Sequence, residues 1–342
     1  MDLACAQSFP AEKMKTSQSS IAYRKWQSRA DRELTMVPWR PLLVFSVIAV
    51  GATTAIAALT SSMGWTVRSP AWGLLAPLAM WAPALGRLVA RRTVDRRFTS
   101  TLPLRRWGVT GARVVLRPLA FPLLVYGASY AIAWSAGLAQ WNPGEGKWTT
   151  GSQIAANVVI NLTLLGMFGT FTAMGEEIGW RGYLQPRLDA AGLRSSLVIV
   201  WLVQVAYHAP LMVGAGYVNV GSFATSFSLF AIGDLAWTFI VARESYLARS
   251  LWPAVFFHSF HNTISQWLFP KFFTVGTDQI WLQGEDGVLP MVGYVVLSAA
   301  FLASMRRRGQ TWQALAEDAL APRADVTDQG RRVRLFSRAF RS

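Results

Sequence analysis

Residues 175–181 read Gly-Glu-Glu-Ile-Gly-Trp-Arg, so two adjacent glutamates close an apolar stretch. The three histidines of the chain, His208, His258 and His261, also lie inside apolar stretches, and the long apolar segments are otherwise almost free of charge. A bilayer penalises each ionisable group by several kcal/mol, so the groups that persist there usually carry function. The pattern predicts a membrane protein with a polar site inside it.

The composition supports the membrane assignment. Of 342 residues, 52% are hydrophobic and 15% are charged, whereas a soluble domain carries about 25% charged residues. Sixteen tryptophans fit aromatic belts at two membrane interfaces. The net charge of +15 is explained by arginines that flank membrane spans, so we expect a lipid bilayer and no nucleic acid as partner. The single cysteine, Cys5, excludes an internal disulfide and a cysteine-rich metal site.

Eight segments contain the roughly 20 mostly apolar residues that a membrane span needs. They are 41–64, 71–90, 118–139, 153–175, 195–213, 222–242, 251–269 and 288–305. We therefore expect an all-α polytopic bundle of about eight transmembrane helices, a single domain over 41–305. Residues 1–40 show no cleavable signal and form an N-terminal segment, so the first span is expected to act as an uncleaved anchor.

The basic residues fall on alternate connections between these spans, which predicts the orientation. One set of connections is basic throughout, whereas the opposite set holds only Arg68, Lys147 and Lys271. The basic set consists of Lys13, Lys15, Arg24, Lys25, Arg29 and Arg32, then Arg91 to Arg117, Arg187 and Arg194, Arg243 and Arg249, and Arg306 to Arg308. The positive-inside rule then places both termini in the cytoplasm. High arginine and tryptophan content suggests a bacterial plasma (inner) membrane.

The tail, 306–342, has two parts. Thr311 to Ala321 could form a short helix that stops before Pro322. Residues 331–341 are basic with interleaved apolar side chains, and this segment could lie on anionic lipid or be a disordered basic tail.

The glutamate pair suggests two different roles. In a helix, Glu177 and Arg181 are four residues apart on one face, so an ion pair is geometrically natural. Glu176 then points about 100° away and is available for other work. A carboxylate in a partly dry site becomes a better base near neutrality. The alternative is that both glutamates are ordinary interfacial charges that end a span.

The histidines favour the catalytic interpretation. His258 and Asn262 share one helical face, whereas His261 is one residue off it and is expected to make a helix–helix hydrogen bond. His208 precedes Pro210, which should kink its helix; alone, it could be a packing hydrogen-bonder. Asp234, the only mid-span aspartate, is expected to make a structural hydrogen bond rather than to act in the site.

Together these side chains could hydrolyse an amide. One carboxylate and one histidine would deprotonate a water, while a second histidine and an asparagine would donate hydrogen bonds to the oxyanion. The chain has no His-Glu-x-x-His string, no Gly-x-Ser-x-Gly in a span, and no second membrane aspartate for an aspartyl protease. Two other classes stay open: a transporter or proton-coupled carrier, and a non-catalytic membrane immunity or scaffold protein.

These residues resemble the CPBP intramembrane proteases, the Abi or CAAX-protease-like family that includes the CAAX prenyl endopeptidase. The family pattern is Glu-Glu-x-x-x-Arg, then Phe-x-x-x-His, then His-x-x-x-Asn or His-x-x-x-Asp, on successive transmembrane helices. The matching residues are Glu176, Glu177, Arg181, His208, His258 and Asn262. The second motif departs from the family, because Gln204 stands where phenylalanine is expected. The specific resemblance covers the motif core, 176–262.

The resemblance implies an integral membrane endopeptidase whose substrate is a membrane-associated peptide or protein. It implies that Glu176 and His208 activate water, and that His258 and Asn262 form the oxyanion site. The family is often labelled a metalloprotease. From the residues alone, Glu176, His208 and His258 could supply three zinc ligands. A metal-free mechanism uses the same residues and is slightly favoured, so no cofactor is firmly implied. The sequence does not identify the substrate or the oligomeric state.

Overall fold

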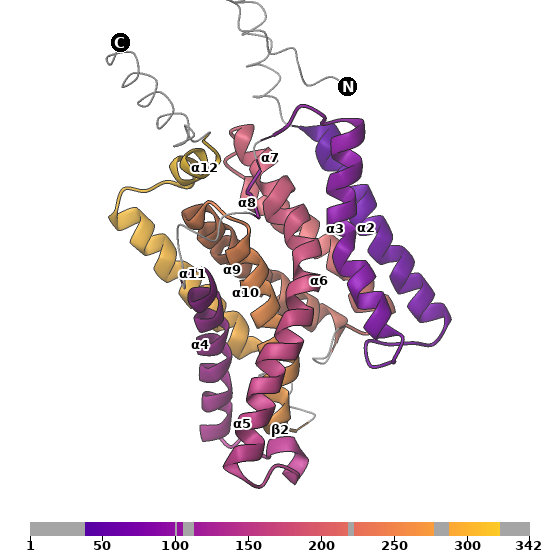
Figure 1. Cartoon of the computed structure of the whole chain (residues 1–342), viewed down its shortest axis with the longest axis vertical. Helices are drawn as coiled ribbons and strands as arrows, with labels where there is room; N and C mark the ends of the chain where they lie inside the picture. The colour runs from indigo at the N-terminus through magenta and orange to yellow at the C-terminus, as the bar shows by residue number, and fades with distance from the viewer. Residues whose placement is uncertain (1–37, 100, 105–112, 218–221, 277–286, 322–342) are drawn as a thin grey trace, which may run out of the picture.

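The computed structural model describes residues 38–99, 101–104, 113–217, 222–276 and 287–321. Figure 1 shows a bundle of helices with one very small sheet. The expectations for residues 1–37 and for the basic segment 331–341 fall outside the described residues. The short helix expected at 311–321 is confirmed as α12, Trp312–Leu320, and the side chain of Thr311 caps it by accepting a hydrogen bond from the backbone N–H of Ala314.

The described helices follow the predicted spans closely. Their bounds are α2 Trp39–Ser62, α3 Trp72–Thr93, α4 Arg113–Ser135, α5 Gly151–Ile160, α6 Gly166–Gly179, α7 Gln185–Ala190, α8 Ser196–Gly214, α9 Phe223–Ala248, α10 Trp252–Asn262 and α11 Val288–Arg307. Within the described ranges, seven helices are long and apolar enough to cross a membrane. The chain is therefore an all-α, polytopic integral membrane protein.

Two spans differ from their predicted form. The one expected at 251–269 is not among the seven, because α10 is short and passes into a π-helical turn, η5 Thr263–Leu268, and a 3-10 turn, η6 Phe269–Lys271. The span expected at 153–175 is part of a continuous helical segment, Gly151–Ala190. Two π-helical turns, η3 Asn161–Leu165 and η4 Trp180–Leu184, carry this segment onward. The prediction ended it at the glutamates, but those charges are buried against protein and so do not end the helix.

The basic connections gather at one end of the bundle, where α7 and α12 lie (Figure 1). Asp95, after α3, accepts from Arg187 of α7 at 3.2 Å, and Arg249, after α9, pairs with Asp318 of α12. Asp189 of α7 accepts from Trp312 of α12 at 3.0 Å. These contacts show that the described parts of the basic connections lie together at one end of the bundle. Which end faces the cytoplasm stays a prediction.

The opposite end carries the sheet. Strand β1, Ala139–Trp141, pairs antiparallel with β2, Phe273–Val275, in the register Ala139↔Val275. The side chain of Asn142 donates to Thr274 Oγ1 at 2.9 Å next to this ladder. The sheet ties the end of α4 to the end of the α10 segment, and so it closes the bundle away from the basic connections.

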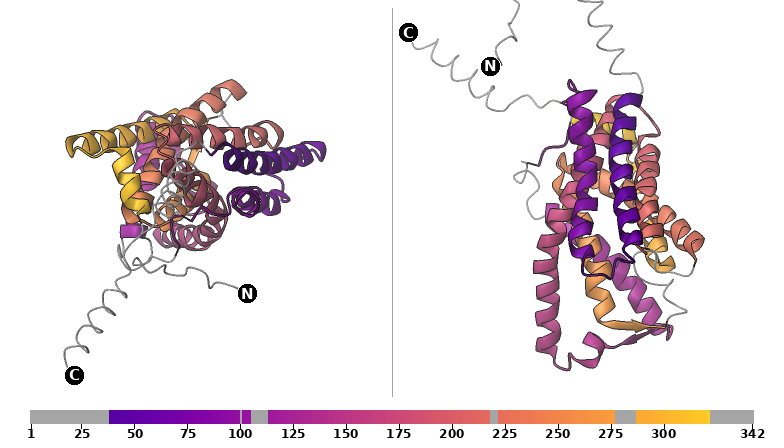
Figure 2. Two further views of the ribbon diagram at one scale, coloured as in Figure 1. Left: turned by 90° about the horizontal axis from the view of Figure 1, so that it is seen from above. Right: turned by 90° about the vertical axis from the view of Figure 1, so that its right-hand side faces the viewer.

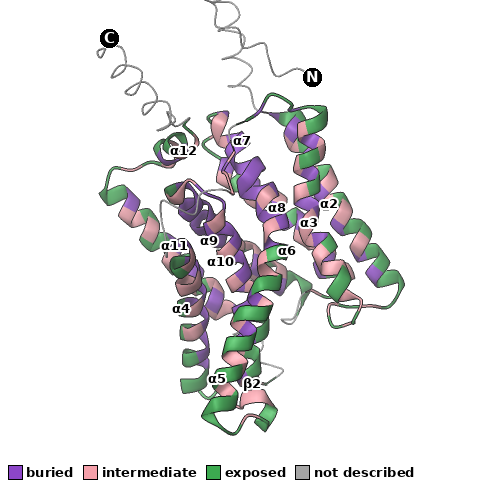
Figure 3. Cartoon of the chain, in the orientation of Figure 1, coloured by how far each residue is buried: buried purple, intermediate pink, exposed green. Residues whose placement is uncertain are grey.

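The core lies between α4, α9, α10 and α11, and a second buried cluster lies where α2, α3 and α8 meet η4. Figure 2 shows α2 and α3 as an antiparallel pair against one side of the bundle. In Figure 3 the outer faces of α5, α6, α2 and α3 are largely exposed. Large apolar side chains such as Leu74 and Met167 lie on these faces, as expected for surfaces that contact lipid.

Candidate active site

One small cavity brings together side chains from five helices, α6, α8, α9, α10 and α11. Its volume is about 50 Å³, and because a water needs about 10–15 Å³ on this scale, it has room for a few waters. Four of the predicted site residues border it: Glu176 from α6, His208 from α8, and His258 and Asn262 from α10. The other residues that border it are Gln204, Phe230, Gly233, Asp234, Trp237, His261, Met291 and Tyr294.

Glu177 and Arg181 support this cavity from behind rather than border it. Arg181 Nη1 donates to Glu177 Oε1 at 3.3 Å, and both side chains are fully buried, which confirms the predicted ion pair. The same oxygen lies 2.9 Å from His258 Nδ1. The Arg181 guanidinium also stacks over Trp237, with Cζ 4.8 Å from the ring centroid. Glu177 therefore fixes His258 through Nδ1, and Nε2 is the nitrogen left to act in the cavity.

A chain of hydrogen bonds links the Glu177–Arg181 pair to the side chain of Gln204, one turn before His208 on α8. Arg181 Nη2 donates to Thr238 Oγ1 at 3.3 Å, and Thr238 Oγ1 donates to Gln204 Oε1 at 2.8 Å. The backbone carbonyl of Gln204 lies 2.8 Å from His208 Nδ1. Gln204, the departure from the family pattern, thus takes part in a polar network where phenylalanine could not. The sequence analysis missed the role of Thr238, because nothing in its local pattern sets it apart.

Glu176 differs from Glu177 in its surroundings. Its side chain is 3% exposed, and Oε2 accepts a hydrogen bond from Trp180 Nε1 at 3.1 Å. Within the described residues it has no ion-pair partner, whereas Glu177 has both Arg181 and His258. Of the two glutamates, Glu176 is therefore the one available to a water in the cavity.

Two glycines place the glutamates at the α3–α6 contact. A Cβ atom at Gly175 would lie 2.7 Å from the carbonyl oxygen of Met80, and one at Gly179 would lie 2.4 Å from Pro83 Cβ. Neither position has room for a side chain, so the Gly-Glu-Glu-Ile-Gly sequence lets α3 pack directly on α6. This contact covers the glutamates on one side, and α10 covers them on the other.

In the described part of the chain, the structural hydrogen bond expected for His261 is present, whereas the one expected for Asp234 is not. His261 Nδ1 lies 2.8 Å from the hydroxyl of Tyr294 on α11, which confirms the predicted helix–helix hydrogen bond, although His261 also borders the cavity. The interpretation of Asp234 as a structural hydrogen-bonder is not supported. Its Oδ2 is buried and has no hydrogen-bond partner among the residues that the structure describes, and the residue borders the cavity. Helix α8 runs on through Pro210 without interruption.

The donor set was also tested against a zinc ion. Glu176, His208 and His258 border one cavity, but no three His, Cys, Asp or Glu side chains in the described part of the chain are placed to hold one metal ion. In this arrangement the three side chains do not form a three-ligand zinc site.

Comparison with known proteins agrees with the motifs. Residues 158–264 match the family model described as type II CAAX prenyl endopeptidase Rce1-like. No curated protein matches the chain. The matched residues run from α5 to η5 and include every member of the three motifs as well as Gln204, Asp234 and Thr238. The stretch that supplies the motif residues of the cavity therefore matches an Rce1-like, CAAX-type endopeptidase family, in agreement with the resemblance seen in the sequence.

Proposed function

We propose that this protein hydrolyses a peptide bond of a membrane-associated peptide or protein, with a water activated by Glu176 and His208. The observation that carries the proposal is the shared cavity, where a carboxylate, two imidazoles and an amide from three helices meet around room for water. General-base and oxyanion groups around one water are the two requirements of amide hydrolysis.

The hydrogen bond to His208 assigns its working nitrogen. A backbone carbonyl only accepts, so Nδ1 must donate to the Gln204 oxygen, and the neutral ring then carries its lone pair on Nε2. That nitrogen can take a proton from water. Glu176 holds the same water from α6, and its carboxylate stabilises the positive charge that develops on the imidazole.

His258 is arranged for the opposite task. Its Nδ1 donates to the Glu177 carboxylate, which orients the ring and stabilises positive charge on it. Nε2 can then donate to the oxygen of the tetrahedral intermediate, together with the amide of Asn262. Arg181 and Trp237 hold Glu177 and His258 in place.

The cavity has room for water but not for a peptide strand, so the helices that border it must separate for a substrate to enter. Helix α9 packs against α8 and α10, and its Gly233, Asp234 and Trp237 border the cavity. Displacement of α9 would expose all four reacting groups at once.

The substrate class is tested with peptides and with membranes. The family description names a prenyl endopeptidase, so farnesylated and unmodified peptides of one CAAX sequence are compared on purified protein in detergent. In parallel, new N-termini are mapped in membranes that contain the wild type or Glu176→Gln. Glutamine keeps an acceptor for Trp180, and Glu145→Gln, an exposed glutamate at the sheet end, is the matched control.

Cleavage by the wild type and by Glu145→Gln, with none by Glu176→Gln, supports the proposal. Identical N-termini in all three membranes, together with no peptide cleavage, would contradict it. Uptake of solutes into liposomes would then separate a carrier from a scaffold protein.

A further inference from the structure

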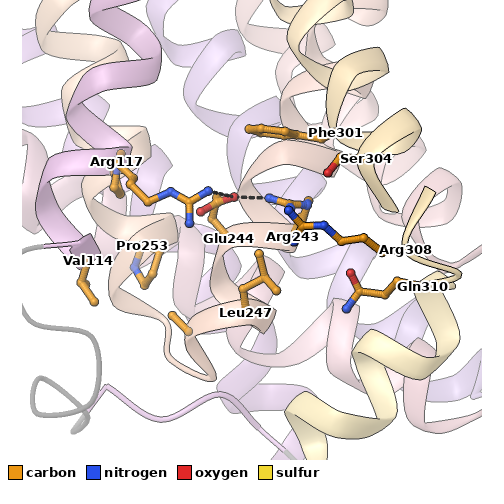
Figure 4. A pocket seen from close by; sticks show the side chains of 12 residues that line it. Val114, Arg117, Arg243, Glu244, Leu247, Pro253, Phe301, Ser304, Arg308 and Gln310 are labelled. Carbon is orange, nitrogen blue, oxygen red and sulfur yellow. Dashed lines mark hydrogen bonds and ion pairs between the residues drawn. The ribbon is translucent and has the colours of Figure 1, made fainter. Parts of the chain in front are cut away.

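A second and much larger cavity lies at the basic end of the bundle. Its volume is about 800 Å³, within the range of small-ligand sites. It opens between the start of α4, the end of α9, the start of α10 and the end of α11 (Figure 4). None of its lining residues belongs to the catalytic cavity.

The charge of this second cavity is strongly positive. Arg117, Arg243 and Arg308 line it, and Glu244 is the sole carboxylate among its described lining residues. Glu244 Oε1 accepts from Arg243 Nη1 at 2.5 Å and from Arg117 Nη2 at 3.4 Å (Figure 4). One carboxylate thus serves two guanidinium groups, and in the described part of the chain Arg308 has no carboxylate partner. The cavity holds an excess of two positive charges.

The guanidinium of Arg243 is buried and held in a fixed position in this cavity. Arg243 is 6% exposed, and its Cζ lies 4.4 Å from the centroid of the Phe301 ring, which fixes the guanidinium plane. Its Nε is buried and has no hydrogen-bond partner in the part of the chain that the structure describes, so Glu244 leaves this guanidinium only partly satisfied. An anionic ligand in the cavity would offset the remaining charge of the arginines. Arginine forks match the paired oxygens of a phosphate.

The position of the cavity indicates where that phosphate comes from. It lies at the ends of the helices, at the end of the bundle where the basic connections gather, and the ends of transmembrane helices lie near the headgroups. Apolar side chains also line it, among them Val114, Leu247 and Phe301, and Leu247 is 42% exposed. In a phosphate diester with two acyl chains, the phosphate can pair with the arginines and the acyl chains can contact the apolar side chains. Basic pockets between helices at this level bind anionic headgroups.

We propose that Arg117, Arg243 and Arg308 bind the phosphate of an anionic glycerophospholipid, which is held between α4, α9 and α11. The lipid binds separately from any peptide substrate, and it neutralises the excess charge. Because Arg243 and Trp237 lie on the same helix, the bound lipid also restrains α9, whose middle part borders the catalytic cavity.

The test uses the full-length protein in detergent, titrated with phosphatidylglycerol, phosphatidylcholine or inorganic phosphate, with binding followed by native mass spectrometry and thermal unfolding. The site variant is Arg117→Gln/Arg308→Gln, both at exposed side chains, so folding is preserved. The matched control, Arg306→Gln/Arg307→Gln, removes the same charge from exposed positions of α11 outside the cavity.

We expect phosphatidylglycerol to bind and stabilise the wild type more than phosphatidylcholine does. The site variant should weaken its affinity on the order of tenfold or more, because each arginine near a headgroup contributes substantially. The control should bind like the wild type. Equal effects of the two lipids, equal losses in the site variant and the control, or full protection by inorganic phosphate alone would each overturn the proposal.

Discussion

Glu177 and His258 meet across the α6–α10 contact, with Oε1 of the carboxylate 2.9 Å from Nδ1 of the imidazole. The same oxygen accepts from Arg181 at 3.3 Å, so one buried carboxylate holds a cation on its own helix and a histidine on another. Because Glu177 is fully buried, both contacts act in a poorly solvated environment where the loss of either partner is costly. Glu177 is therefore a positioning residue, and Glu176 is the catalytic candidate.

The two glutamates should respond differently to the same substitution. Glu177→Gln leaves the buried Arg181 without a carboxylate, and breaking a buried pair costs about 3–5 kcal/mol. We expect it to lower both the unfolding temperature and turnover, whereas Glu176→Gln should abolish cleavage and keep the unfolding temperature. Thermal unfolding in detergent and peptide turnover measure the two effects. The double variant Glu177→Gln/Arg181→Gln should regain part of the lost stability. Equal, mild effects on turnover would remove the division of roles.

Asn262 and His261 provide a second matched pair on α10. Removal of one oxyanion donor typically slows turnover by about 10²–10³. Asn262→Ala should show a loss of this size in kcat with little change in KM. His261→Ala should be far milder for turnover, because its Nδ1 is already engaged by Tyr294 on α11. A fully active Asn262→Ala protein would exclude the asparagine from the mechanism.

Much of the fold and part of the site follow from local patterns. The spans can be predicted because each is a run of apolar residues. The Glu177–Arg181 pair can be predicted because residues four apart share a helical face. Asp234 and Thr238 are different. Their roles depend on how α9 packs against α8 and α10 and meets Arg181 of η4, which no spacing within α9 encodes. The length of the α5–α7 segment was also missed, because a charge pair ends a span only if it faces water or headgroups.

The α3–α6 contact predicts the effect of a methyl group at Gly179. An alanine Cβ would lie 2.4 Å from Pro83 Cβ, so α3 and α6 must move apart. Overpacking of this kind costs about 1–3 kcal/mol. Gly179→Ala should therefore lower the unfolding temperature and, by shifting the adjacent glutamates, also turnover. Gly51→Ala is the control, since a Cβ in that part of α2 meets nothing within 4 Å. Equal unfolding temperatures for the two variants would show that the contact is loose.

The orientation can be tested with introduced cysteines in a Cys5→Ser background. Thr149 lies before α5 at the sheet end, and Ser195 lies in the basic α7–α8 connection; both are exposed. The positive-inside rule places Ser195 in the cytoplasm. On intact cells, an impermeant maleimide should label Thr149→Cys and not Ser195→Cys, whereas both should react after lysis. The reverse pattern would invert the topology and place the lipid site in the outer leaflet.

The dependence of activity on zinc can be tested by chelation. Three nitrogen and oxygen ligands would bind zinc tightly, and its removal would then abolish activity. His258 is instead held by Glu177, while Glu176 and His208 border the water-sized cavity and can activate water unaided. We expect protein purified through a chelator step to keep most of its activity relative to a mock-treated sample, and elemental analysis to find no stoichiometric zinc. Stoichiometric zinc, with inactivation by chelator and recovery on zinc addition, would reassign His258 from oxyanion donor to metal ligand. The role of Glu177 would then change too, because a carboxylate on Nδ1 of a metal-bound histidine orients the ligand and raises its affinity for the ion.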